Sequence, residues 1–130
     1  MKNRDLYISA LHLIGENAYA EENLDYEERS PYLIAAFCSE AANTEAAYRE
    51  YKELDKAPVL DNVNIPLDTE FPFIDRFCHA ATLYLAAMLI IDENPELSDK
   101  LFDKYCCAMA TIQSEIPSRI EKIAEKYGAI

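Results

Sequence analysis

The stretch CHAATLYLAAMLII, residues 78–91, contains no formally charged side chain, whereas the whole chain carries 24 acidic residues against 12 basic ones. Its alanine, leucine and methionine content favours a helix, which we expect to begin around Pro72 and to end near Asp92. A helix that spans a bilayer needs about 20 apolar residues, so this stretch predicts a buried helix and not a membrane span.

The two faces of this predicted helix differ along its length. The face that we expect in the core consists of Ile74, Phe77, Cys78, Ala81, Tyr84, Leu85 and Met88. The opposite face begins with Asp75, Arg76 and His79 and then turns apolar at Leu83, Ala86, Ala87 and Ile90. A helix that is apolar all round must be covered on every side. Either other helices of the same domain cover the second half, or a second subunit does.

Start and stop signals predict further helices on both sides of this stretch. Apolar residues at helical spacing indicate a helix over residues 3–14, which Gly15 is placed to end. Asn94 and Pro95 are residue types preferred at a helix cap and first turn, so another helix should follow them. Its apolar stripe consists of Leu97, Leu101, Tyr105, Met109 and Ile112. Cys107 lies off this stripe, either as an exposed thiol or on a face that an assembly covers.

The second helix has an ambiguous beginning. Asp25 and Glu28 have the spacing of a capping box, which places the start near Asp25. Pro31 either kinks the helix or marks a fresh start with Ser30 as the cap. The apolar face beyond it consists of Leu33, Ile34, Phe37, Ala41 and Tyr48. That face predicts a helix with one side buried.

Between the second and third helices, the stretch KAPVLDNVNIPLDTEFP (residues 56–72) has a different character. It contains three prolines, and Val63, Ile65 and Leu67 alternate with Asn62, Asn64 and Pro66. This pattern predicts an extended arm or a short β-like loop.

Pro117 separates the last part of the chain from the fourth helix. After it, Ile120, Ile123, Ala124 and Tyr127 recur at the spacing of an amphipathic helix. This helix either docks on its own domain or inserts into a groove on a partner. The prediction is an all-α bundle of about four to five helices with one extended arm. Residues 1–116 form the domain, and residues 117–130 form a separable C-terminal helix.

Composition argues against several function classes. A net charge of −12 disfavours ordinary DNA binding and anionic membranes. With two glycines in the chain, no glycine-rich phosphate loop can form. The four cysteines lack a C-x-x-C spacing and indicate reduced thiols, and we see no signal peptide, so the protein is expected in the cytosol when made. We expect no catalytic residues, no metal and no cofactor.

The order of several segments resembles tailed-phage head–tail connector (adaptor) proteins. The matching segments are DLYISALHLIGEN (5–17), LDYEERSPYLIAAFCSEA (24–41), APVLDNVNIPLDTEFPFIDRF (57–77) and AATLYLAAMLIIDENPELSDKLFDKYCCAM (80–109). No single segment is diagnostic, and the most telling part is an apolar helix followed by DENPELSDKLFDKY. The tail after Pro117 does not match the family pattern residue by residue.

The resemblance implies a structural, non-catalytic subunit of a ring of about a dozen copies below the capsid portal. Such a protein resides in the virion, and in the bacterial cytoplasm during assembly, with portal and tail-completion proteins as partners. Subunit contacts are implied at the arm residues Val63 and Ile65, and we also expect them at Leu83, Ala86, Ala87 and Ile90. Portal-side anchors are implied at Ile120, Ile123, Ala124 and Tyr127.

The resemblance also offers a reason for the acidic composition, because carboxylates that line a DNA channel repel phosphate. The candidates for a channel or its rim are Glu16, Glu21, Glu22, Asp25, Glu27 and Glu28. An acidic surface can equally serve solubility. The alternative function is a small acidic helical binding module that regulates a host protein, and such a module should concentrate its charge on one face.

Overall fold

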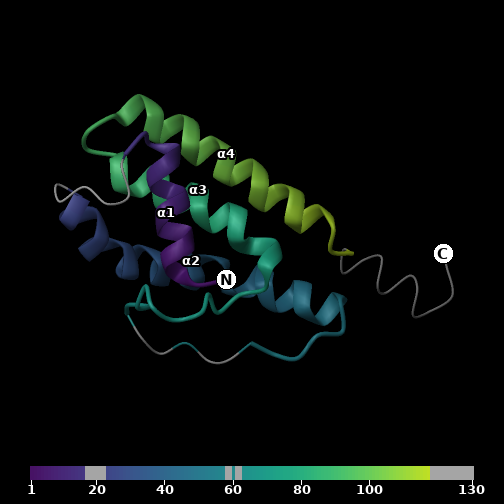
Figure 1. The fold of residues 1–130 in the computed structure, drawn as a ribbon. Coiled ribbons are helices and arrows are strands. Elements are labelled where there is room, and N and C mark those ends of the chain that lie inside the picture. The colour runs from purple at the N-terminus through teal and green to yellow at the C-terminus, as the bar shows by residue number, and fades with distance from the viewer. Residues whose placement is uncertain (17–22, 58–59, 61–62, 118–130) are drawn as a thin grey trace, which may run out of the picture.

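The computed structural model describes residues 1–16, 23–57, 60 and 63–117, and they form an all-α bundle. The helices are α1 (Asn3–Leu13), α2 (Leu24–Tyr51), α3 (Cys78–Ile90) and α4 (Pro95–Ser114), with a short 3₁₀ helix (Asp75–Phe77) before α3. The central helix, α3, contacts α1, α2 and α4 (Figure 1). Among the described helices, none combines the length and the apolar character that crossing a membrane requires.

The second half of α3 is enclosed by helices of its own chain. Ala86 and Ala87 have no exposed surface, and Leu83 and Ile90 are 3% and 6% exposed. Ser98 of α4 donates its hydroxyl hydrogen bond to the carbonyl oxygen of Ala87 at 2.8 Å, a close approach that small side chains on α3 permit. Of the two alternatives for this apolar face, the structure therefore favours enclosure within one domain.

An aromatic cluster at the centre of the bundle joins α2 to the rest of the fold. The ring of Phe37 in α2 lies 5.9 to 6.3 Å, between centroids, from the rings of Phe71, Phe73, Tyr84 and Tyr105. These partners belong to the segment before α3, to α3 and to α4. Tilted and edge-on rings at such separations add to the free energy of area burial. One phenylalanine therefore holds three elements against α2.

The local helix signals at Gly15 and Asn94 are confirmed. Gly15 has φ +77°, a left-handed conformation that glycine adopts without strain and that ends α1. Asn94 caps α4, since its side-chain oxygen accepts a hydrogen bond from the Leu97 N–H at 3.1 Å. Leu101, Tyr105, Met109 and Ile112 of the predicted stripe are buried, and Leu97 is half-buried.

Of the two alternatives at Pro31, the fresh start with Ser30 as the cap is wrong, because α2 continues through Pro31. The Ser30 hydroxyl donates to the Tyr26 carbonyl oxygen within the helix, at 2.6 Å, and so does not cap a new start. The cap position belongs to Asn23, and not to Asp25. The carbonyl oxygen of Pro31 accepts a hydrogen bond from Ile65 N–H at 3.0 Å, so this turn of α2 also holds the arm.

Helix α3 begins later than we expected. Ile74 has an extended backbone (φ −65°, ψ 155°), so the chain enters the 3₁₀ helix after it, and α3 starts at Cys78. The backbone N–H of Ile74 donates to the side chain of Glu45 at 3.0 Å, which fixes this non-helical conformation. Proline at position 72 therefore marks the end of the arm and not the first turn of α3.

The segment between α2 and the 3₁₀ helix, the predicted arm, forms no helix or strand in its described residues. Its second half is fastened to the start of α1 by backbone hydrogen bonds from Asn3 N–H to Thr69 and from Arg4 N–H to Leu67, at 3.0 and 2.9 Å. The Asn3 amide donates to the Pro66 carbonyl oxygen at 3.1 Å and to the Thr69 carbonyl oxygen at 2.9 Å. These contacts join the beginning of the chain to residues more than 60 positions later.

Candidate functional site

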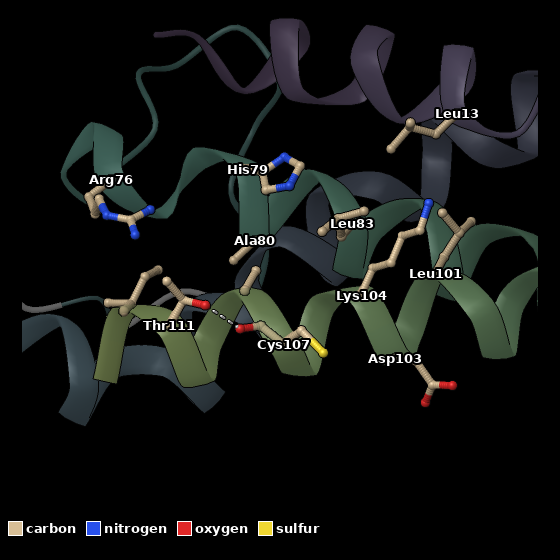
Figure 2. Close-up of a pocket in the computed structure, with 12 residues that line it drawn as sticks. Leu13, Arg76, His79, Ala80, Leu83, Leu101, Asp103, Lys104, Cys107 and Thr111 are labelled. Carbon is tan, nitrogen blue, oxygen red and sulfur yellow. Dashed lines mark hydrogen bonds between the residues drawn. The ribbon is translucent and has the colours of Figure 1, made fainter. Parts of the chain in front are cut away.

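A groove with a volume of about 590 Å³ runs between α3 and α4 and reaches the end of α1 (Figure 2). Its apolar lining comes from Leu13, Ala80, Leu83, Leu101, Ala108 and Ile112. The exposed polar residues around it are Arg76, His79, Asp103, Lys104, Cys107 and Thr111. An apolar floor between polar edges is the form of site that receives the apolar face of a helix.

The polar edges of the groove carry both signs of charge. At one end, Arg76 forms an ion pair with Glu115, which follows α4, with 2.5 Å between Nη2 and Oε1. This pairing lowers the pKa of Glu115 and raises that of Arg76. Farther along α4, the Lys104 side chain reaches toward Leu13, whereas Asp103 points away from the groove (Figure 2). The groove therefore has no single charge sign that would select a strongly charged ligand.

The cysteines divide into interior and surface thiols. Cys38 is buried, and burial raises its pKa to about 12, so it behaves as an apolar core side chain. Cys78 is half-buried, and burial raises its pKa as well. Cys106 and Cys107 are exposed, as the position of Cys107 off the apolar stripe predicts. Within the described ranges, no three His, Cys, Asp or Glu side chains are placed to hold a metal ion.

The middle of the arm is the second candidate site. Val63 is 79% exposed and Leu60 is 43% exposed, although both are large apolar side chains. Ile65, in contrast, is 8% exposed and belongs to the core. Tyr32, which directly follows the residue that accepts the Ile65 N–H hydrogen bond, is 56% exposed. The arm is thus fixed near its end and presents apolar side chains to solvent before that point.

The remaining predicted subunit contacts lie in the interior. Leu83, Ala86, Ala87 and Ile90 are core residues of a single chain and present almost no surface to a second one. Of the six predicted contact residues, Val63 is therefore the one that the structure leaves available, and a contact between subunits has to use it together with other exposed residues.

The predicted acidic residues differ in how far their charge is balanced. Asp25 pairs with Arg29 at 3.0 Å, and Glu27 pairs with Arg4 at 3.1 Å. Glu28 is exposed, and no ion pair of the described residues includes it. Glu16 is half-buried after α1. Glu21 and Glu22 lie outside the described residues, as do the portal-anchor candidates Ile120, Ile123, Ala124 and Tyr127.

A buried ion pair is the main feature that our reading of the sequence missed. Glu45 of α2 has no exposed surface, and both its carboxylate oxygens accept hydrogen bonds from Arg49 Nε at 2.7 Å. Arg49 also donates to the carbonyl oxygen of Asp55, at 2.9 Å. A signal was present, because Glu45 falls on the apolar face of α2 with a basic residue four positions later.

A second missed residue is Asn3. Its side chain is buried and supplies the hydrogen bonds that fasten the arm to α1. Among the residues that the structure describes, its side-chain oxygen finds no hydrogen-bond donor. An asparagine near the beginning of a helix reads in the sequence as a surface residue, and nothing nearby in the sequence indicates the distant partner.

Comparisons with known proteins assign no family to this chain: it matches no family model, no curated protein and no solved structure.

Proposed function

We propose that this chain is a structural adaptor of a tailed phage or prophage, one subunit of a ring that links the capsid portal to the tail. The proposal begins from the order of segments that resemble the adaptor family. An observation made on the fold supports it: apolar side chains stand exposed on an arm whose base is fastened to the bundle.

The exposed side chains are Val63 and Leu60 on the arm and Tyr32 on α2. A contiguous exposed apolar patch commonly marks a surface that another protein covers, and we propose that these three side chains belong to such a patch. In a closed ring, each subunit offers the same arm to the same surface of its neighbour, so one such contact repeats around the ring. An arm that is held to α2 at Ile65 and exposed at Val63 suits this role, because the hydrogen bond and the burial of Ile65 fix where the arm meets the bundle.

The start of α2 fits a channel or rim position in this proposal. Glu28 is exposed, and its negative charge would discourage DNA from binding to the wall of a conduit. Asp25 and Glu27 contribute less, because Arg29 and Arg4 compensate their charges. The segment with Ile120, Ile123, Ala124 and Tyr127 remains the proposed portal-side anchor, a helix that inserts its apolar face into a groove.

The alternative, an acidic module that regulates a host protein, calls for one concentrated acidic face. In the described residues, exposed carboxylates are spread over several elements. They include Asp5 on α1, Glu28, Glu40 and Glu50 on α2, Asp68 and Glu70 on the arm, and Glu96 and Asp103 on α4. This distribution favours the adaptor over the acidic module.

Light scattering coupled to gel filtration tests the proposal, with this chain alone and mixed with the portal protein encoded near it. The adaptor function predicts a complex with many copies of this chain, formed alone or when the portal is present. A monomer or dimer whose mass is the same with and without the portal protein contradicts the proposal. The acidic binding module is then the better explanation.

A further inference from the structure

The groove between α3 and α4 begins where the described chain leaves α4. Glu115 is held by Arg76, which lines this end of the groove. Ile116 is half-buried against the core. Arg76 and Thr111 lie at the same end of the groove, and Leu13 and Leu101 lie at the other (Figure 2). Residue 117 therefore lies near one end of an apolar groove, and the chain has to reverse its direction there to run along the groove.

Pro117 redirects the chain at this point. A proline cannot continue the hydrogen-bond ladder of α4, and it disfavours helical geometry in the residue before it. The next residues, Ser118 and Glu121, have the spacing of a capping box, and Gly128 can end a helix that starts there. The sequence after α4 thus has its own start and stop signals for a helix of about two and a half turns.

The length and pattern of this segment match the groove. Along α4, the groove extends from Ile112 back to Leu101, which corresponds to about 16 Å of helix. A helix over residues 119–127 is about 14 Å long. Its apolar face consists of Ile120, Ile123, Ala124 and Tyr127. Leu13, 43% exposed at the far end of the groove, is an apolar contact for the last of these side chains.

We infer that residues 118–130 fold back and dock as a short helix in the groove between α3 and α4 of their own chain. Three residues separate Ile116, packed on the core, from Ile120, the first apolar anchor. So short a tether gives an effective concentration in the millimolar range or above, which favours the groove of the same chain over that of a second copy. The inference concerns the isolated chain. A portal that binds the same apolar face would first have to displace the segment from this groove.

Charge is compatible with this occupant. The segment carries Arg119, Lys122 and Lys126 and so reverses the acidic balance of the rest of the chain. Its Glu121 and Glu125 can face the cationic side chains at the edges of the groove, which belong to Arg76 and Lys104. A mixed-charge helix therefore meets a groove whose edges carry both signs.

Two neighbouring thiols provide the test, because Cys107 lines the groove and Cys106, also exposed, does not. The full chain is prepared as Cys106→Ser, which keeps Cys107, and as Cys107→Ser, which keeps Cys106. Each is compared with the same protein that also carries Ile120→Asp and Ile123→Asp, and the rate of maleimide labelling is measured. Circular dichroism confirms that the bundle stays folded in all four proteins.

Docking predicts that the two aspartates speed the labelling of Cys107 about tenfold or more, since a thiol covered nine-tenths of the time reacts only when the segment opens. The labelling rate of Cys106 stays unchanged. An equal Cys107 rate with and without the aspartates overturns the inference, and it is the result expected if the segment lies instead in the hollow lined by Ala46, Ala47 and Leu54. Protection that disappears on about a hundredfold dilution also overturns it, because the occupant is then a second copy.

Discussion

Glu45 and Arg49 form a buried ion pair one turn apart on α2, with side chains 1% and 15% exposed. The same carboxylate accepts the N–H of Ile74 at 3.0 Å, and the guanidinium donates to the carbonyl oxygen of Asp55 at 2.9 Å. The pair therefore fixes the chain where it leaves α2 and where it returns before α3. This arrangement sets the two ends of the arm.

Removing one partner of this pair should be costly. We expect Glu45→Gln to lower the free energy of unfolding by about 3 to 5 kcal/mol, because Arg49 is then left partly buried without its counter-charge. Urea unfolding followed by circular dichroism measures the change. The matched control is Glu50→Gln, an exposed carboxylate on the same helix, which should change stability by less than about 0.5 kcal/mol. Equal stability of the two variants contradicts a structural role for the pair.

The cap of α4 contributes less to the free energy of unfolding than the Glu45–Arg49 pair does. Asn94→Ala removes the hydrogen bond from Leu97 N–H and should destabilise the protein by about 1 kcal/mol. Asn43→Ala, an exposed position within α2, serves as the control and should be neutral or slightly stabilising, because alanine is the better helix former there. If Asn43→Ala and Asn94→Ala lose the same stability, then the hydrogen bond of the cap does not explain the effect of Asn94→Ala.

The tyrosine at the start of α2 predicts a stability change at high pH. Burial and the hydrogen bond that Tyr26 donates to Glu93 raise the pKa of Tyr26 to about 12, from 10.0. Between these values the unfolded chain releases the phenolic proton while the folded chain keeps it, so stability falls as the pH rises from 10 toward 12. The full contribution of this group is present below pH 10.

Tyr26→Phe should therefore flatten part of the alkaline loss of stability, measured by urea unfolding at a series of pH values. The exposed Tyr32 supplies the control, since Tyr32→Phe keeps the Tyr26 hydrogen bond and should lose stability with pH as the wild type does. If Tyr26→Phe has the same alkaline slope as the wild type, then the Tyr26–Glu93 contact does not shift this equilibrium.

A substitution at Val63 can test the proposed role of the arm in assembly separately from folding. Val63 is 79% exposed, so Val63→Asp should leave the free energy of unfolding within about 0.5 kcal/mol of the wild type. If the arm contacts a neighbour, the same change should abolish the large complex in light scattering, because it places a charge in an apolar contact. Ile91→Asp, at an exposed apolar position directly after α3, should keep the complex. Complexes that form equally well with both variants place the subunit contact elsewhere.

The start and stop signals of helices could be predicted from the sequence, because each acts through one or two residues. Gly15 ends α1 through its positive φ, and Asn94 caps α4 through its own side chain, so neither depends on distant contacts. The choice between a helix that continues through Pro31 and a fresh start at Ser30 could not be made from the sequence. Ser30 hydrogen-bonds within the helix at that position, and tertiary packing of α2 outweighs the local cost of the proline.

The faces of α3 show a different limit. Because its second half is apolar on all sides, hydrophobic periodicity does not indicate which side meets which neighbour. Leu83 and Ala86, which we expected opposite the core face, are as deeply buried as Tyr84 and Leu85. The groove between α3 and α4 could not be predicted from the sequence either, because it depends on how residues from three helices come together.

Negative-stain electron microscopy of the portal protein mixed with this chain tests the adaptor function most directly. The account predicts side views in which an additional ring-shaped layer lies below the portal, and the loss of that layer with Val63→Asp. Side views identical to those of the portal alone, with this chain present in excess and folded, would contradict it.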